Sequence, residues 1–138
     1  MIKIKLTNWN VGRNEPTFRP FLLYSRQFLD IGVQFVQDGS YDYEFLGMHD
    51  FINKKIPLNE SIAYGIEQVN KRDGNCYLFD GSDSTSLMGA WEIVQNTNVL
   101  GLFKNQLLDR QEYKKSSAFN KWFFGNGSDL DLSYDISE

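Results

Sequence analysis

The chain has 138 residues, a length that fits one folded domain. Its hydrophobic content of 41% and its aromatic content of 15% exclude a disordered chain. The formal net charge is −4, and the acidic excess lies at the carboxyl end, where no basic residue follows Lys121. The rest of the chain is neutral, which is not typical of a protein that docks on nucleic acid or on an anionic membrane by charge.

The single cysteine, Cys76, excludes an internal disulfide and is too little for a structural zinc site. No apolar run approaches the roughly 18 to 20 residues that a membrane span requires. Residues 1–6 lack the continuous apolar stretch of a signal peptide. We therefore expect a cytoplasmic protein with no membrane span, no structural zinc site and no nucleic-acid partner, and we assign no metal ligands.

The first half of the chain alternates between strand and helix patterns. Apolar residues alternate with lysines at the start of the chain, which is typical of a strand with one buried face. Farther on, apolar residues recur at helical spacing behind two prolines and stop at a glycine. In chain order, we expect a strand over residues 2–6, a polar loop over 7–14, a helix over 21–31 and strands over 33–36 and 43–48.

The second half continues the same alternation. Asn59 is a candidate N-cap for a helix that the turn at residues 73–74 ends. The order is then a strand over residues 76–79, a helix over 87–94, a strand over 99–103 and a short helix over 106–113. An aromatic cluster at residues 119–124 favours core packing or a subunit interface. The alternating residues 130–136 indicate one more strand or a segment that pairs outside this chain.

Strands that alternate with helices predict a three-layer α/β/α sandwich with a mainly parallel, Rossmann-like sheet of about five strands. We assign residues 1–125 to this α/β domain. Residues 126–138 form an acidic C-terminal segment, which is either an extra strand or an interdomain linker. In such folds, ligands bind beyond the carboxyl ends of the parallel strands, so the polar residues that follow each strand are the candidate site.

The turn after the strand over 76–79 is rich in carboxylates and hydroxyls. Backbone amides at the start of the following helix favour an anion, whereas Asp80 and Asp83 suit a divalent cation or the hydroxyls of a sugar. Alternatively, Ser84 or Thr85 caps the helix and Asp80 holds the turn. Both interpretations stay open. The candidate ligand-binding residues in this part of the chain are Asp80, Ser82, Asp83 and Ser84, with Lys104 after the last strand.

Two earlier loops also follow strands. The loop after the first strand holds Asn8, Trp9, Asn10 and Arg13, but it has no Gly-x-Gly-x-x-Gly pattern, so we expect no tight dinucleotide site. Trp9 either stacks on a ligand ring or covers the edge of the sheet. In the loop after the third strand, a histidine and an aspartate follow each other at residues 49–50.

His49 and Asp50 are the candidate catalytic residues. A histidine at this place could act as a general base or bind a ligand oxygen. Alternatively, it hydrogen-bonds the end of the strand and has a structural role.

With the strand ends placed, the chain resembles the N-terminal Rossmann-like half of a GT-B-type glycosyltransferase. The resemblance depends on the opening strand and loop over residues 2–13, on residues 43–50, on residues 78–84 and on the Phe-Lys stretch in residues 102–107. It covers most of residues 1–125. In that family the N-terminal domain mainly binds the acceptor, and a second Rossmann-like domain holds the nucleotide sugar.

The resemblance implies an acceptor-binding domain for a polar, hydroxyl-rich ligand of the sugar or nucleotide-sugar type. Asn8, Trp9, Asn10, Arg13, His49, Asp50, Asp80 and Asp83 would line the acceptor cleft, with His49 or Asp50 as the base. Because the second domain is missing, we expect the chain to be catalytically incomplete alone, and the sequence names no cofactor. The alternative is a non-catalytic α/β module that forms a homo-oligomer through its aromatic C-terminal segment.

Overall fold

The structure is a computed structural model that describes residues 1–12, 14–52, 55–72, 75–81 and 89–104. The chain divides into two compact units. The first consists of Met1–Gly81 and Gly89–Phe103, and the second of Ser82–Met88 and Lys104–Glu138. Apart from Lys104, the residues of the second unit lie outside the described part of the chain. The boundary expected at residue 125 and the predicted elements beyond Lys104 therefore stay predictions.

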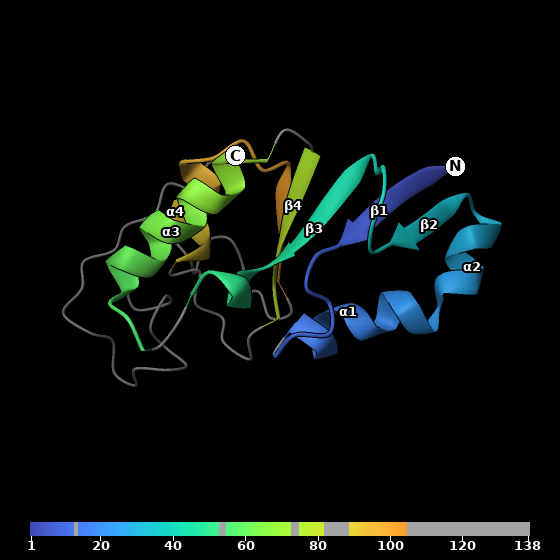
Figure 1. Ribbon diagram of the computed structural model, residues 1–138, viewed down its shortest axis with the longest axis horizontal. Coiled ribbons are helices and arrows are strands. Elements are labelled where there is room, and N and C mark those ends of the chain that lie inside the picture. Colours follow the sequence, from blue (N-terminus) through green and yellow to red (C-terminus); the bar gives the residue numbers. More distant parts are fainter. Residues whose placement is uncertain (13, 53–54, 73–74, 82–88, 105–138) are drawn as a thin grey trace, which may run out of the picture. The chain divides into compact units, whose positions relative to one another are not determined.

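The first unit is built on a parallel five-stranded sheet with the strand order β2-β1-β3-β4-β5 (Figure 1). The pairings of β1 with β2, of β1 with β3 and of β3 with β4 are all parallel. The α/β fold with a Rossmann-like parallel sheet is thus confirmed. The strands are β1 (Ile2–Leu6), β2 (Val33–Val36), β3 (Tyr43–Gly47), β4 (Asn75–Asp80) and β5 (Gly101–Lys104).

The connection from β2 to β3 crosses β1 without a helix. Parallel strands usually need a crossover of about a dozen residues or more, yet only residues 37–42 join these two strands. The stagger of the strands explains the short crossover, because Val36 pairs with Lys5 at the end of β2 and Tyr43 pairs with Ile4 at the start of β3. The chain therefore moves sideways over β1 rather than back along its whole length.

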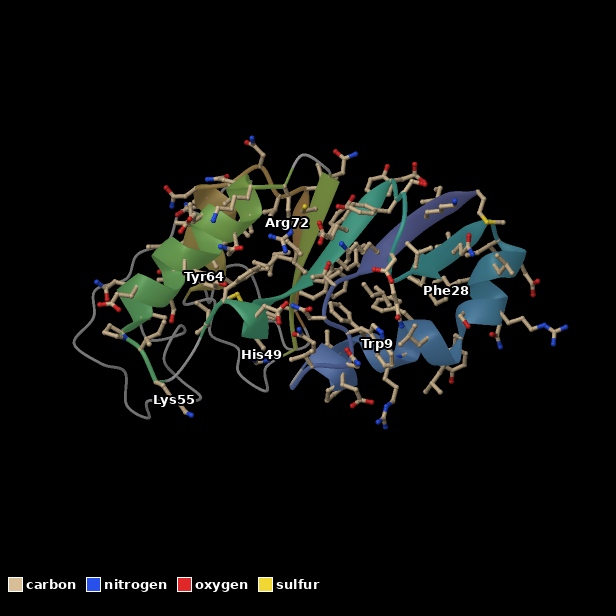
Figure 2. All side chains as sticks on the ribbon, viewed as in Figure 1. Trp9, Phe28, His49, Lys55, Tyr64 and Arg72 are labelled. Atoms are coloured by element: carbon tan, nitrogen blue, oxygen red, sulfur yellow. The ribbon has the colours of Figure 1, made fainter. Side chains whose placement is uncertain are left out.

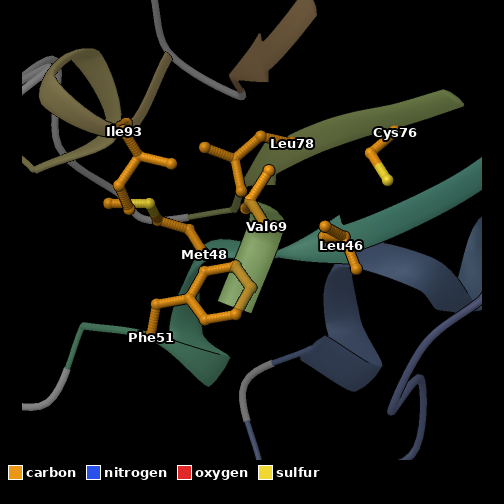
Figure 3. Close-up of a cluster of buried hydrophobic side chains, with 8 residues drawn as sticks. Leu46, Met48, Phe51, Val69, Cys76, Leu78 and Ile93 are labelled. Atoms are coloured by element: carbon orange, nitrogen blue, oxygen red, sulfur yellow. The ribbon is translucent and has the colours of Figure 1, made fainter. Parts of the chain in front are cut away.

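Helices cover both faces of the sheet. Phe18, Phe21 and Leu22 pack with side chains of β1, β2 and β4 on one face. On the other face, one apolar cluster joins β3 and β4 to two further helices (Figure 3). The first face belongs to α1 (Asn14–Leu23) and α2 (Ser25–Asp30), and the second to α3 (Leu58–Asn70) and α4 (Ala90–Gln95), with a 3₁₀ turn, η1, at Met48–Asp50.

The prediction of one helix over residues 21–31 is wrong. The chain is helical from Asn14, so Pro16 lies in the first turn of α1, where its missing N–H costs nothing. Pro20 lies inside α1 and cannot donate to the preceding turn, and the helix ends after Leu23. A second short helix, α2, then begins at Ser25.

Two predicted helix caps are also wrong. Pro57 is the N-cap of α3, so Asn59 lies within the first turn of that helix. Gly89 is the N-cap of α4, in place of Ser84 or Thr85. Its positive φ of 85° is a conformation that glycine adopts without strain, and its N–H donates to the Glu92 carboxylate at 2.7 Å. None of the helices in the described ranges is long and apolar enough to cross a membrane.

Candidate functional site

The carboxyl ends of β1 and β3 form the topological switch point of the sheet. From β1 the chain goes to β2 on one side, and β3 then pairs with β1 on its other side. In open parallel sheets, the crevice at such a point is where ligands bind. The loop after β1 and the η1 turn after β3 meet there.

Two asparagine side chains hold the carboxylate of Asp50 at this point. The Nδ2 of Asn14 donates to Oδ1 of Asp50 at 2.8 Å, and the Nδ2 of Asn8 donates to Oδ2 at 3.1 Å. Asn14 Nδ2 also lies 3.3 Å from the backbone oxygen of Asn8. Each carboxylate oxygen keeps further lone pairs, so the group is fixed in orientation and still able to accept hydrogen bonds from a ligand.

Asn14 is buried, with a relative exposure of 1%. Its Oδ1 lies against Gly47 and accepts no hydrogen bond from the described residues. A Cβ at Gly47 would come within 1.9 Å of that oxygen, so glycine is the residue that leaves room for the Asn14 amide. Because an unsatisfied buried acceptor is unfavourable, the bond from the amide nitrogen to Asp50 explains why the side chain keeps this orientation.

The loop after β1 has an uncommon backbone conformation. Asn8 has a φ of 51°, a left-handed value that asparagine tolerates better than most residues. The loop then closes on itself, because the Val11 N–H donates to the Asn8 carbonyl at 3.0 Å and the Asn14 N–H donates to the Val11 carbonyl at 3.1 Å. These bonds bring Asn8 and Asn14 to the same carboxylate.

Burial raises the pKa of the Asp50 carboxyl above its ordinary value of 3.8. The hydrogen bonds from Asn8 and Asn14 oppose this shift because they favour the charged form of Asp50, and so do the electrostatic interactions with Arg72 and His49. A carboxylate with a raised pKa binds a proton more readily than an exposed one, which is what a general base at neutral pH requires.

His49 lies beside this carboxylate in η1, below the end of β3 (Figure 2). Its side chain is half-buried, and Met48 in the same turn is buried in the core. Asp80 ends the neighbouring strand, since the β3–β4 register pairs Gly47 with Phe79. The structure thus brings Asn8, Asp50 and His49 to the switch point and places the buried Asp80 at the end of the adjacent strand.

The structure does not place the remaining predicted site residues in contact with the Asp50 carboxylate. Trp9 is partly buried and packs against the cluster of Leu6, Phe18 and Phe79, within the sheet rather than at its edge strand β2. Asn10 is exposed, and Lys104 is the last residue of β5. Arg13, Ser82, Asp83 and Ser84 lie outside the described residues.

A second polar cluster surrounds the Glu44 side chain of β3. The buried carboxylate of Glu44 accepts a hydrogen bond from Thr7 Oγ1, lies 3.2 Å from Arg72 Nε and accepts a bond from Tyr41 at 3.3 Å. Since Thr7 directly precedes Asn8, this cluster fixes the start of the loop that orients Asp50. Burial raises the pKa of Tyr41 and of the Cys76 thiol, and the negative charge of Glu44 raises both further.

A small cavity of about 60 Å³ lies away from the Asp50 carboxylate. It is lined by Val69, Asn70, Arg72, Cys76, Asn98 and Val99. Cys76 is near the amino end of β4, whereas Asp80 is at its carboxyl end. The cavity is therefore distinct from the switch point. It has room for a water molecule or two, but not for a sugar.

Within the described ranges, no group of three or more His, Cys, Asp or Glu side chains could hold a metal ion. Comparisons were made with family models, with curated proteins and with solved structures. None of them matches this chain.

Asn14, Gly47 and Glu44 are the residues of this region that the sequence patterns did not single out. An asparagine at the start of a helix is typical of an ordinary cap. A glycine at the end of a strand is equally common. Glu44 lies within an apolar strand, and a carboxylate at such a position is the one signal that could have indicated a buried polar cluster.

Proposed function

We propose that this domain binds a small, polar ligand rich in hydroxyl groups, of the sugar or nucleotide-sugar type, at the switch point between β1 and β3. The observation that carries the proposal is the Asp50 carboxylate, which is half-buried and held through both oxygens by Asn8 and Asn14. A fixed carboxylate beside side-chain amides offers acceptors and donors at set positions, which suits vicinal hydroxyls.

The charges of the described residues favour a ligand that donates hydrogen bonds. Asp50 follows β3 and the buried Asp80 is the last residue of the adjacent β4, and both carboxylates would repel a free phosphate. These charges therefore make a bare anion an unfavourable ligand. A sugar, or a nucleotide sugar that presents its sugar hydroxyls to Asp50, remains compatible with the site.

The narrower proposal is a glycosyltransferase-like acceptor domain. A transferase must remove a proton from the acceptor hydroxyl, and a carboxylate with a raised pKa next to a histidine supports this role. Asp50 would then be the base, with His49 as its neighbour in the same turn. A donor site would come from a second domain, so the chain alone would bind the acceptor without turnover.

Binding can be tested by NMR titration of the full chain with N-acetylglucosamine, maltose and UDP-glucose at millimolar concentration. We expect at least one probe to shift the amide signals of Asn8 and Asp50. The Asp50→Ala variant should lose this response while its circular dichroism stays that of the parent. Asp38→Ala, in an exposed turn, is the matched control and should bind normally. The proposal would be contradicted if no probe shifted the amide signals, or if the Asp50→Ala variant bound a probe as well as the parent.

The second candidate is the non-catalytic module that self-associates through its aromatic C-terminal segment. That segment lies outside the described residues, but one feature of β5 favours an apolar partner. Phe103 stacks on Phe79 with the ring centroids 4.7 Å apart, and half of its surface is exposed. Replacing Trp122 and Phe123 by alanine should then reduce the oligomer measured by light scattering, whereas the sugar-binding proposal predicts no change.

A further inference from the structure

The first turn of α1 lies against the carboxyl ends of two neighbouring strands (Figure 1). A Cβ at Gly47, the last residue of β3, would collide with the Asn14 side chain. In the same way, a Cβ at Gly81, which directly follows β4, would collide with Thr17 Oγ1. The absence of a side chain at both positions allows this close approach of the helix to the edge of the sheet.

Asn14 and Thr17 are neighbours on the surface of α1. Residues three apart in a helix have their β-carbons about 5–6 Å apart, and adjacent strands are about 4.8 Å apart. The turn therefore spans the interval between β3 and β4, with Asn14 at the first strand and Thr17 at the second. Because Asn14 also donates to Asp50, the Thr17 hydroxyl lies about one helical turn beyond the contact that holds this carboxylate.

The Thr17 hydroxyl is available for a ligand. Its side chain is half-buried, and within the described ranges it forms no hydrogen bond with another residue. Two other threonines differ in this respect, since the Thr7 hydroxyl donates to the Glu44 carboxylate and the Thr97 hydroxyl to the Ile93 carbonyl. A hydroxyl without such a partner among the described residues is free to donate one hydrogen bond to a ligand and to accept others.

The chemistry of these groups suits an uncharged ligand with several hydroxyls. The ionised Asp50 carboxylate only accepts hydrogen bonds, whereas the Thr17 hydroxyl both donates and accepts them. One ligand hydroxyl can therefore donate to Asp50 while a second bonds to Thr17. Hydroxyls on adjacent carbons lie too close together to reach both groups across a helical turn. The ligand must present hydroxyls from opposite sides of one sugar ring or from two linked rings.

We infer that the Thr17 hydroxyl is a second ligand contact of the switch-point site, and that it selects sugars whose hydroxyls span the first turn of α1 between Asp50 and the end of β4. This inference rests on the proposed function, because it assigns a further contact to the same ligand. Thr17 is then a specificity-determining residue. A ligand with only two adjacent hydroxyls reaches Asp50 alone and binds more weakly.

Affinities measured by NMR titration of the full chain test this contact, with N-acetylglucosamine, maltose and UDP-glucose as probes. Thr17→Val removes the hydroxyl and keeps the shape of the side chain. It should weaken the binding of the best probe about tenfold, which corresponds to the loss of roughly one hydrogen bond. Thr17→Ser keeps the hydroxyl and should weaken binding less. Thr97→Val, which removes a hydroxyl after the end of α4, is the matched control and should bind as the parent does.

Probes that lack single hydroxyls separate a ligand contact from a structural role. The monodeoxy derivative of the best probe that lacks the hydroxyl bound by Thr17 should bind the parent about tenfold more weakly. Thr17→Val should weaken the binding of this derivative no further, because the contact is already lost. A residue that only supports the turn would instead add its own loss to that of every derivative. Thr17→Ala, which is too small to press on Gly81, repeats the comparison if circular dichroism shows that the valine variant is unfolded.

A parent protein that binds no probe would contradict the proposed function, and the Thr17 contact with it. If the parent binds a probe and Asp50→Ala does not, the proposed function holds and the Thr17 variants decide the contact. Equal binding by the parent and by the variants that lack the hydroxyl would then overturn only the contact. Losses that add to those of every deoxy derivative would overturn it as well.

Discussion

The side-chain amide of Asn14 donates a 2.8 Å hydrogen bond to the Asp50 carboxylate across 36 residues of sequence. One partner is the first residue of α1 and the other is the last residue of η1. The bond ties the helix that follows β1 to the turn that follows β3. It therefore stabilises the fold and orients the carboxylate of the candidate site at the same time.

Replacing Asn14 by alanine should lower the free energy of unfolding by about 1–3 kcal/mol, because one oxygen of a half-buried carboxylate loses its donor. Urea denaturation measures the loss. Asn10→Ala, in the same loop but exposed, is the control and should change the stability by about 0.5 kcal/mol or less. Equal effects of the two substitutions would show that Asn14 is not a structural link.

Gly47→Ala should displace the Asn14 side chain, since the new Cβ would come within 1.9 Å of its Oδ1. We expect a loss of about 1–3 kcal/mol in unfolding free energy, as in other overpacked sites. Gly101→Ala is the control, because its nearest neighbour would be Tyr77 at 3.4 Å, an ordinary contact. A Gly47→Ala protein as stable as the Gly101→Ala protein would disprove this close approach.

The pKa of Asp50 predicts the sign of a pH effect. Because burial raises this pKa in the folded state, the folded chain holds the Asp50 proton at pH values where the unfolded chain has lost it. The contribution of this carboxyl to stability is therefore fully present below the ordinary value of 3.8 and is lost as the pH rises through the folded-state pKa.

Urea denaturation of the parent and of Asp50→Asn across this range tests the sign. The stability of the parent minus that of the variant should decrease as the pH rises above 3.8. An increase of that difference over the same range would mean that the pKa of Asp50 is lowered. A carbon-detected NMR titration of the carboxyl group would measure the pKa directly.

Glu44→Gln should destabilise the protein by about 1–3 kcal/mol. The substitution leaves the largely buried Arg72 without its carboxylate partner and weakens the bond from Thr7. Glu67→Gln removes one member of an ion pair in which both side chains are about 60% exposed, so its effect should be about 0.5 kcal/mol or less. Similar denaturation midpoints for the two variants would contradict the importance of the buried cluster.

Much of the sheet could be predicted from local patterns. The alternation of apolar residues and lysines predicted β1 with its observed bounds, and the apolar run at residues 33–36 did the same for β2. These signals are local, because the period of a strand depends only on which side chains face the core. The start of α1 was not predicted, because two prolines so close together indicate a loop unless the first turn of a helix accommodates one of them.

The candidate site was predictable only in part. Position after a parallel strand was enough to single out Asn8 and Asp50, since the carboxyl ends of neighbouring strands meet at one edge. The sequence by itself therefore determined the α/β alternation and which polar residues follow each strand. Only the tertiary structure decided that Asn14 and Asn8 share one carboxylate, that Gly47 leaves room for this contact and that β1 lies between β2 and β3. Strand order and side-chain contacts depend on residues far apart in the chain.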